Sequence, residues 1–489
     1  MPRGGRYLGQ PCRCGNVKQM SATAPTTRES RLAWLDALRG FAALCVVFDH
    51  GSTLLLLPAR SFLYHWVNLG QYGVFVFFLV SGYIVPASLE RKGSIRGFWI
   101  SRAFRLYPMF LLVLVLAAVL HTAGYGTVAN ASRHPAAAAL GWLFMLQNVT
   151  AGVNVPVTVW TLSYEMVFYL LLAGLFAWGV HRRSGWYATA FAVAAVALGG
   201  VLPMALFGSW SRYGGSNQVP LNATVDVLLL VGLGLAVAAR SWPAKAGATL
   251  AALVGLVLVM VNQTYPFPWS GSVILALMFT GTVIYRAEQG QLNRLAAAAI
   301  TLGVLALITF AGIWHGAQQH EDHNWQLQWA TSILLAGATF AIGLALRRAR
   351  VPGWCAWLGM ISYSVYLLHP LVFDAYREIP ALHRQHTMPN QVLFFAGLLA
   401  VIIGLSALTY YFVEKPMQRL GRRVAARFPY PATETVSADS VSAPAGNAPA
   451  GNAPAGNAPA GDPPAGPPAA AARSASSSTV VAGGSGGSP

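Results

Sequence analysis

The stretch RLAWLDALRGFAALCVVFDHGSTLLLL, residues 31–57, decides the fold class. It is apolar and long enough to cross a bilayer, whose hydrocarbon core takes about 20 residues of helix. It nevertheless contains Asp36, Arg39, Asp49 and His50. A charged side chain at the centre of a membrane costs about 2.5–3.5 kcal/mol on insertion scales. These four residues therefore predict a functional site that faces the interior of a helix bundle.

Helical geometry places Arg39 and His50 on nearly the same face of this expected helix. The two positions are eleven residues apart, and at about 100° per residue the side chains return to the same side. They are separated by about 16 Å along the axis, which is half a bilayer. Asp36 lies one turn before Arg39 on that side. One face thus carries a carboxylate and a guanidinium near one end and an imidazole nearer the other.

The composition predicts an all-α polytopic integral membrane protein. Of its 489 residues, 55% are hydrophobic and only 10% are charged, whereas soluble domains are about 25% charged. The net charge of +17 comes from short basic clusters between apolar runs, which is typical of cytoplasmic loops. Because these residues do not form one stripe, we expect no nucleic-acid partner. Cys12 and Cys14 form a lone C-x-C pair, so we expect no metal site.

Thirteen apolar runs follow one another along the chain, and most are close to the length of about 20 residues that crossing requires. They are residues 33–57, 67–88, 104–120, 136–149, 160–180, 187–207, 222–239, 246–261, 271–285, 295–314, 327–346, 354–373 and 391–413. All basic clusters lie in the cytoplasm only if one early segment does not cross. The weakest is 136–149, which is short and ends in Gln147 and Asn148. We expect it to be re-entrant or peripheral, which leaves about twelve spans. If it crosses instead, Arg182 and Arg183 face outward.

Three regions are expected. Residues 1–30 are polar and basic and predict a disordered cytoplasmic arm rather than a cleavable signal peptide. Residues 31–425 form the membrane domain. Residues 426–489 include tandem GNAPA repeats, and an Ala/Pro/Gly tail of this kind cannot bury a core, so we expect disorder. Both termini are expected in the cytoplasm.

A pair of arginines follows the second apolar run. Arg102 and Arg105, in RGFWISRAFRLYP, are three residues apart and share a helix face at the cytoplasmic end of the third span. Two guanidinium groups there suit a phosphate-bearing ligand. The alternative is a simple anchor of the positive-inside kind.

Glu165 stands inside the apolar segment PVTVWTLSYEMVFYL, residues 156–170. At about one and a half turns below the outer surface it lies at the depth expected for His50. A buried carboxylate needs a partner, and His50 or an arginine is the natural one. A helix-packing ion pair without chemistry is the alternative.

Four further residues have a structural or lower-ranked interpretation. Ser81 and Gly82 are small residues among aromatics and predict close helix packing. His369, in LGMISYSVYLLHPLVF, is a second candidate histidine ranked below His50. Glu414, in YYFVEKP, is interpreted as a stop at the inner end of the last span.

The motifs LDALRGFAALCVVFDH, FFLVSGYIV, SRAFRLYP, WTLSYEMVFY, ISYSVYLLHP and YYFVEKP, in this order, resemble the membrane acyltransferase 3 family over about residues 31–420. That family includes O-acetylases of O-antigen, exopolysaccharide and nodulation factors, and macrolide acyltransferases. Its arginine–histidine pair falls on Arg39 and His50, its R-x-x-R pair on Arg102 and Arg105, and its glutamate on Glu165. The tail lacks the serine and histidine set of the SGNH domain that some members carry, and the family's usual ten core spans compare with the twelve counted here.

The resemblance implies a bacterial inner-membrane enzyme that transfers an acyl group from cytoplasmic acyl-CoA, by default acetyl-CoA, to a hydroxyl group. In this hypothesis His50 is the general base or the nucleophile that carries the acyl group. Glu165 orients its ring, as a third group does in catalytic triads. Arg102 and Arg105 hold the CoA phosphates, and Arg39 contacts the pantetheine arm or the thioester oxygen.

The expected acceptor is a carbohydrate or glycoconjugate. Polysaccharide, lipid-linked sugar, peptidoglycan and small secondary metabolite all satisfy the chemistry, and the sequence indicates no oligomeric state. A secondary transporter is the rival class, because it too has about twelve spans with intramembrane charges. Against it, the charged residues concentrate in the first five segments and no second copy of the Arg/His pattern follows. A purely structural membrane protein is a third reading.

Overall fold

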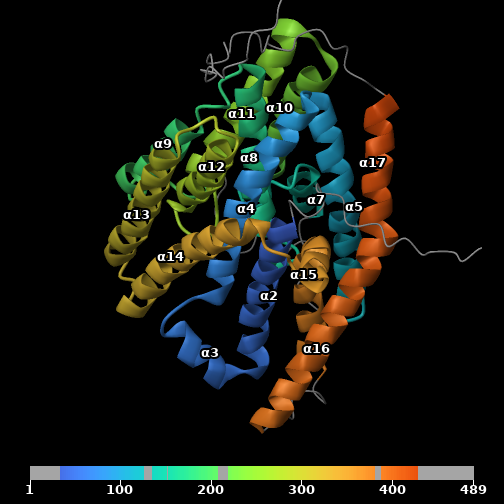
Figure 1. Cartoon of the computed structure of the whole chain (residues 1–489). Coiled ribbons are helices and arrows are strands. Elements are labelled where there is room, and N and C mark those ends of the chain that lie inside the picture. The colour runs from blue at the N-terminus through green and yellow to red at the C-terminus, as the bar shows by residue number, and fades with distance from the viewer. Residues whose placement is uncertain (1–32, 126–134, 151, 208–217, 380–386, 428–489) are drawn as a thin grey trace, which may run out of the picture. The chain divides into compact units, whose positions relative to one another are not determined.

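A computed structural model describes residues 33–125, 135–150, 152–207, 218–379 and 387–427 (Figure 1). These residues form helices and connecting turns, with no β-strand in the described ranges. The arm expected at 1–30, with Cys12 and Cys14, and all of the expected tail beyond residue 427 lie outside them. The prediction of an all-α polytopic membrane protein is confirmed.

Eleven helices of the described residues are long and apolar enough to cross a membrane. They are α2 (Ala33–Leu55), α4 (Leu69–Lys92), α5 (Ile95–Thr122), α8 (Trp160–Ala177) with the 3-10 turn η1 (Val157–Val159) before it, α10 (Gln218–Ala238), α11 (Ser241–Val261), α12 (Ser270–Glu288), α13 (Arg294–Gln318), α14 (His323–Ala345), α15 (Gly353–Arg377), and the continuous run of α16 (Met388–Thr409), η4 (Tyr410–Glu414) and α17 (Lys415–Arg427).

Four shorter elements complete the described chain: α3 (Leu57–Tyr64), α7 (Pro135–Leu143), α9 (Ser184–Leu198) and η2 (Leu346–Arg348). The apolar α9 has 15 residues; it begins just before the expected run 187–207 and ends inside it. The described residues thus hold eleven candidate spans where about twelve were expected, and the shorter α9 stands in place of the twelfth. The nine residues of α7 rise only about 14 Å, so the segment 136–149 is too short to cross as a helix, as expected.

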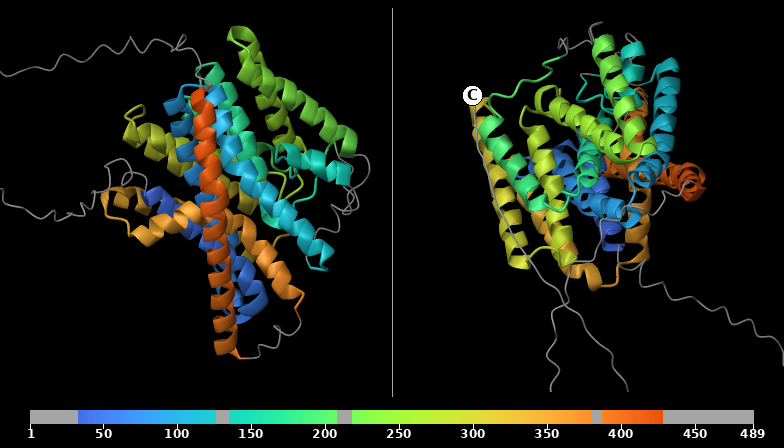
Figure 2. Two further views of the ribbon diagram at one scale, coloured as in Figure 1. Left: turned by 90° about the vertical axis from the view of Figure 1, so that its right-hand side faces the viewer. Right: turned by 90° about the horizontal axis from the view of Figure 1, so that it is seen from above.

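The last span is longer than its apolar run. The sequence predicts 391–413 with a stop at Glu414, but α16, η4 and α17 form one helical run over Met388–Arg427 along the side of the bundle (Figures 1 and 2). Its apolar part is only 11% buried inside the protein, as expected for a helix that faces lipid. The basic α17 packs along α5. Glu414 is thus inside a helix, not at its end.

The centre of the bundle consists of α2, α4, α12 and α15. The apolar window of α12 is 89% buried, and those of α4 and α15 are each 78% buried. In this centre α2 packs against α15 and α4, and α4 packs against α12. These helices therefore carry the core of the molecule, and side chains on their inner faces can meet away from lipid.

Glycine pairs let the central helices touch backbone to backbone. A Cβ atom placed on Gly82 of α4 would lie 1.8 Å from the carbonyl oxygen of Met278 in α12, and one on Gly281 would lie 2.2 Å from that of Leu79. At the other central crossing, a Cβ on Gly359 of α15 would lie 1.9 Å from the carbonyl oxygen of Asp36 in α2. These clashes explain why glycine is needed there, and they bear out the packing role expected of Gly82.

We expect Gly82→Ala to destabilise the bundle. The added methyl group would meet main-chain atoms that cannot turn away, and overpacking of this kind costs about 1–3 kcal/mol or more. The measurement is the thermal unfolding midpoint of the purified protein in detergent. Gly303→Ala and Gly404→Ala are matched controls, because nothing lies within 4 Å of a Cβ at either position. An unchanged midpoint for Gly82→Ala would contradict the proposed backbone contact.

Candidate active site

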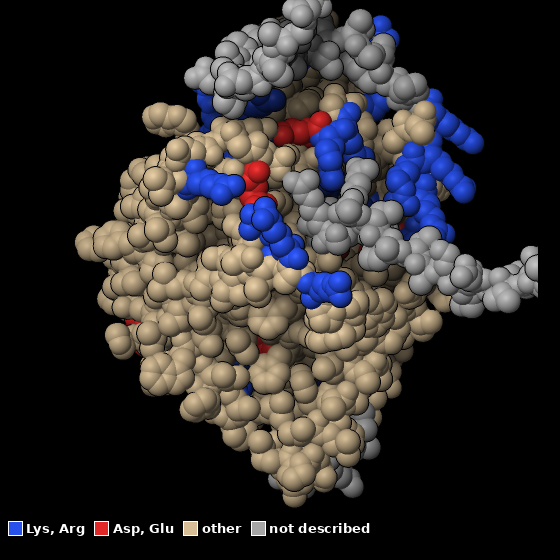
Figure 3. Space-filling view, viewed as in Figure 1, with Lys and Arg blue, Asp and Glu red and all other residues tan. Residues whose placement is uncertain are grey.

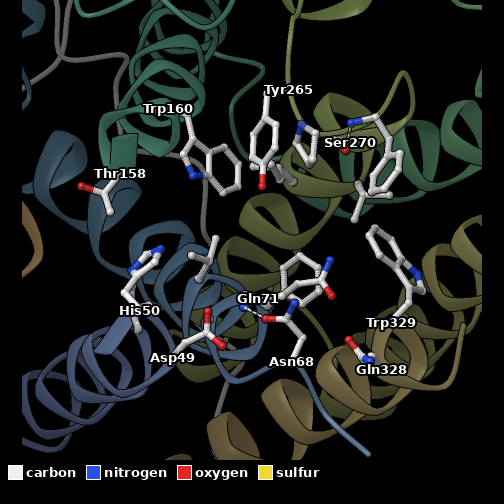
Figure 4. A pocket seen from close by; sticks show the side chains of 18 of the residues that line it. Asp49, His50, Asn68, Gln71, Thr158, Trp160, Tyr265, Ser270, Gln328 and Trp329 are labelled. Atoms are coloured by element: carbon white, nitrogen blue, oxygen red, sulfur yellow. Dashed lines mark hydrogen bonds between the residues drawn. The ribbon is translucent and has the colours of Figure 1, made fainter. Parts of the chain in front are cut away.

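The larger of two central cavities contains His50 and Asp49 at the end of α2 (Figure 4). It has a volume of about 290 Å³ and is formed by α2, α4, α15, η1 with the start of α8, the ends of α3, α12 and α14, and the loop before α12. We call it the histidine cavity. Its other side chains are mostly aromatic or amide-bearing: Tyr64, Asn68, Gln71, Phe75, Trp160, Tyr265, Phe267, Trp325, Gln328, Trp329 and Tyr366.

His50 forms a pair with His369 of α15. The Nδ1 atom of His50 lies 3.0 Å from the Nε2 atom of His369, and the two rings stack with centroids 5.1 Å apart. His369 is completely buried. Its Nδ1 atom lies 3.0 Å from the carbonyl oxygen of Val365 in the preceding turn. The ring of His369 is therefore fixed from both sides.

This chain of hydrogen bonds defines which nitrogen of His50 is free. A carbonyl oxygen only accepts, so Nδ1 of His369 must carry the hydrogen. In a neutral His369 the Nε2 atom is then an acceptor, and Nδ1 of His50 must be the donor. The remaining nitrogen of His50, Nε2, consequently has an unshared electron pair. Such a nitrogen can take a proton or attack a carbonyl carbon.

Asp49 is held in the same cavity by a cluster from α3. Arg60 Nη1 lies 3.6 Å from its carboxylate and donates to its carbonyl oxygen at 3.1 Å. Tyr64 and Gly70 line the cavity beside this carboxylate. Burial, and to a lesser extent the Asp49 charge, raise the pKa of the Tyr64 hydroxyl to about 12. Tyr64 therefore stays protonated at neutral pH and can donate to Asp49.

The second cavity contains Arg39, Arg105 and Glu165 together with Ser81 and Tyr363, and we call it the arginine cavity. It is much narrower, at about 50 Å³. The Glu165 carboxylate accepts hydrogen bonds from the Tyr169 hydroxyl and, at 3.4 Å, from Ser81. Its charge also acts on the Arg39 guanidinium. Ser81, assigned to packing by the sequence analysis, therefore holds a polar group of this cavity.

Arg102 and Arg105 occupy different environments. Arg105 lines the arginine cavity, whereas Arg102 is only 4% exposed. The Arg102 guanidinium lies beside the rings of Phe98 and Tyr169, 5.3 Å and 5.1 Å from their centroids, and one Nη donates to Tyr169 at 3.4 Å. Its Nε atom has no hydrogen-bond partner among the described residues. The two arginines thus share a helix but do not form one surface.

Glu414 belongs to the same charged centre. It is buried and accepts a hydrogen bond from Ser364 of α15, and its charge acts on Arg39 together with those of Asp36 and Glu165. The sequence alone predicts only a stop of the last span at Glu414. Its position in an apolar run, YYFVE, was the signal that could have identified it as a buried functional carboxylate.

The pairing expected between His50 and Glu165 needs correction. Within the described chain, His50 contacts His369, and Glu165 lies in the other cavity with Arg39 and Arg105. The sequence left two partners open for Glu165, a histidine or an arginine, and the structure places an arginine beside it. His369, which was ranked second, takes the place next to His50. Its distance of 319 positions along the chain left no local pattern to reveal the contact.

Comparison with known proteins identifies the class of this protein. A family model described as an acyltransferase domain (Acyl_transf_3) matches residues 32–411. The chain belongs to this acyltransferase family. It is therefore an acyltransferase enzyme of the membrane, and the transporter and purely structural readings fall away.

Several curated proteins are similar to this chain. "Acyltransferase MdmB" from Streptomyces mycarofaciens is 26% identical over 428 residues, which is 83% of this chain and 97% of that protein. "Nodulation protein 10" from Rhizobium leguminosarum is 31% identical over 34% of this chain and 48% of its own length. "Peptidoglycan O-acetyltransferase OatA" from Listeria monocytogenes is 28% identical over 30% of this chain and 24% of its own length. The chain thus spans nearly all of the first relative and half or less of the other two. No solved structure matches it.

We expect His369→Phe to slow acyl transfer without weakening donor binding. Phenylalanine fills the space but removes the acceptor that fixes the His50 ring and stabilises its protonated form. A hydrogen bond to a charged group contributes about 1.5–3 kcal/mol, so kcat should fall about 10- to 150-fold. Steady-state kinetics of the purified enzyme provide the test, with KM for the acyl donor expected to stay within about twofold.

His369→Gln supplies the matched comparison. Its amide oxygen can still accept from Nδ1 of His50, so part of the lost rate should return, and the pH profile of kcat should be closer to that of the wild type. A purely structural role for His369 would instead give equal losses in both variants, with reduced thermal stability.

Proposed function

We propose that this enzyme transfers an acyl group, by default acetyl, from cytoplasmic acyl-CoA to a hydroxyl of a carbohydrate or glycoconjugate on the other side of a bacterial inner membrane. One observation carries the proposal. A cavity lined by guanidinium groups adjoins a cavity in which a histidine, with a free nitrogen, stands among aromatic and amide side chains.

The distribution of charge supports this orientation. Lys and Arg side chains gather over the upper part of the face in Figure 3, and few lie over the lower part, where α3 is found in Figure 1. Basic residues mark the cytoplasmic side of membrane proteins, so the upper end and both chain termini are assigned to the cytoplasm. His50 lies eleven residues beyond Arg39 along α2, about 16 Å farther from that end.

The arginine cavity suits the donor. Arg39 and Arg105 line it, and Arg102, whose buried Nε atom lacks a partner, lies one turn from Arg105. At the basic end the charges of Arg91, Arg102 and Arg422 act on Lys92. Such a concentration of positive charge attracts the phosphates of CoA and directs the thioester arm toward Arg39. Arg39 is then placed to interact with the thioester oxygen.

The histidine cavity suits a sugar acceptor. Indole and phenol rings such as those of Trp160 and Tyr265 can cover the apolar face of a sugar ring, while Asn68, Gln71 and Asp49 can hydrogen-bond its hydroxyls. Its volume of about 290 Å³ is at the lower end of the range of about 300–1,000 Å³ seen for ligand pockets. The Listeria relative is named a peptidoglycan O-acetyltransferase, and peptidoglycan is a carbohydrate polymer with hydroxyl groups of this kind.

The transfer step uses the free nitrogen of His50. As a base, Nε2 takes the hydroxyl proton while the acceptor oxygen bonds to the thioester carbonyl carbon; the carbon–sulfur bond breaks, and the CoA sulfur receives the proton. As a nucleophile, Nε2 first bonds to the carbonyl carbon and the carbon–sulfur bond breaks to release CoA thiolate; the acceptor oxygen then bonds to that carbon, the carbon–nitrogen bond breaks, and the hydroxyl proton passes to the CoA sulfur. Both routes give an ester and free CoA, and both leave His50 positively charged at an intermediate point. His369 can accept a hydrogen bond from that cation.

We expect His50→Ala to abolish acyl transfer. Loss of a general base or nucleophile lowers rates by about 10²–10⁴-fold. The purified protein in nanodiscs would receive radiolabelled acetyl-CoA and bacterial envelope glycan, with released CoA and labelled glycan measured. His121→Ala is the control, because it removes a different histidine, at the end of α5. Label on the wild-type protein without acceptor would favour the nucleophile, and unchanged CoA release by His50→Ala would sink the proposal.

Arg105→Gln and Trp160→Ala should separate the two substrates. We expect Arg105→Gln to raise KM for acetyl-CoA by about tenfold or more, since charge-assisted hydrogen bonds contribute about 1.5–3 kcal/mol, and to leave KM for the acceptor unchanged. Trp160→Ala should do the reverse. Arg294→Gln and Trp186→Ala, both at exposed positions, are the matched controls. If both site variants raised the same KM, the assignment of one cavity to each substrate would be wrong.

A further inference from the structure

Tyr366 of α15 stands between the two cavities. It lines the histidine cavity and also the arginine cavity, as does Val74 of α4. Tyr366 is only 6% exposed, and Phe77 of the arginine cavity packs edge-on against its ring at 5.6 Å between centroids. A molecule that crosses this boundary between the cavities therefore meets this ring.

The ring is held in place by hydrogen bonds to the start of α8. The Tyr366 hydroxyl lies 2.9 Å from Thr161 Oγ1 and donates to the carbonyl oxygen of Thr158 at 3.1 Å. Thr158 Oγ1 in turn donates to the carbonyl oxygen of Tyr366 at 3.3 Å. Thr158 faces the histidine cavity and Thr161 faces the arginine cavity. These contacts join α15 to α8 at the boundary between the cavities.

The size of the arginine cavity indicates that this arrangement is a closed one. At about 50 Å³ it is far below the range of about 300–1,000 Å³ that ligands occupy, so an acylated pantetheine arm enters only if the lining moves. Side-chain rotation is the smallest movement that opens a path. Tyr366 lies one turn from His369 on α15, with the two rings 6.0 Å apart, so a path opened there leads to the histidine pair.

We propose that Tyr366 is a gate that closes the acyl-donor cavity off from the acceptor cavity and opens when both substrates are bound, so that His50 acts as the base and not as the nucleophile. This inference rests on the proposed function. The closed gate would keep water in the histidine cavity from the thioester. Without it, water would take the place of the acceptor: its oxygen bonds to the carbonyl carbon, the carbon–sulfur bond breaks, the CoA sulfur takes a proton, and a free carboxylic acid is lost.

The test compares release of CoA with and without acceptor, for purified enzyme in nanodiscs supplied with acetyl-CoA. We expect Tyr366→Ala to raise release without acceptor by about tenfold or more relative to release with acceptor. Tyr366→Phe keeps the ring but loses the hydroxyl, and Thr161→Val removes one partner at nearly constant shape. Each should raise acceptor-free release about two- to tenfold, the factor that a hydrogen bond contributes.

A double variant shows where the attacking water is activated, and a tyrosine outside both cavities is the control. Tyr366→Ala combined with His50→Ala should abolish the extra release, because the water that attacks is activated in the histidine cavity. Tyr187→Phe is the matched control, since its hydroxyl also donates to a main-chain carbonyl, that of Val180 at 3.1 Å, but it lies on α9 and lines neither cavity. It should behave as the wild type.

The outcomes distinguish the gate from the proposed function. If the wild type consumes acetyl-CoA with acceptor but acceptor-free release is unchanged in all three gate variants, the gate is overturned and the function stands. Extra release that persists without His50 also overturns the gate, because water would then enter from the donor side. If Tyr366→Ala does not assemble, Tyr366→Phe and Thr161→Val decide the question alone. No His50-dependent release by the wild type with acceptor would overturn the function itself.

Discussion

The structure depends on how ionisable side chains are accommodated at membrane depth. Inside a hydrocarbon layer an unpartnered charge is costly, and α2 alone brings Asp36, Arg39, Asp49 and His50 into the bundle. Each is matched from another element, and for Asp36 this partner is Arg105 of α5, whose charge acts on it. Arg60 of α3 holds Asp49, His369 of α15 holds His50, and the charges of Glu165 and Glu414 act on Arg39. The helices around α2 can be understood as the source of these partners.

Close packing makes this matching possible. Gly82 and Gly281 bring α4 and α12 into main-chain contact, and Gly40 and Gly359 do the same for α2 and α15. Because α2 and α15 approach so closely at one crossing, the imidazoles of His50 and His369 meet farther along the same pair of helices. Between helices in a membrane, association relies on packing and hydrogen bonds rather than on the hydrophobic effect. Small residues and the polar site therefore depend on each other.

The division into two cavities accounts for how one enzyme could serve substrates on opposite sides of a membrane. Charged groups gather in the narrow cavity, while rings and amides line the wide one. The histidine pair lies on the wide side, and α15 contributes both His369 and Tyr366 at the boundary. Under the proposed function the arginine cavity recognises only one chemical class, the acyl donor, whereas the lining of the histidine cavity can vary with the acceptor.

The sequence by itself determined the helical class, most of the spans and the presence of charges inside them. Apolar length and helical spacing are local properties, so the placing of Arg39 and His50 on one side of α2 followed from 3.6 residues per turn. The ordered motifs also indicated the acyltransferase family, which the family match then showed. Only the tertiary structure decided which helices adjoin. It placed His50 against His369, and Glu165 in the same cavity as Arg39 and Arg105. It also extended the last helix through Glu414 and placed Tyr366 between the two cavities. These contacts join residues up to 319 positions apart, and they depend on how helices cross at glycine contacts, which periodicity along one segment does not encode.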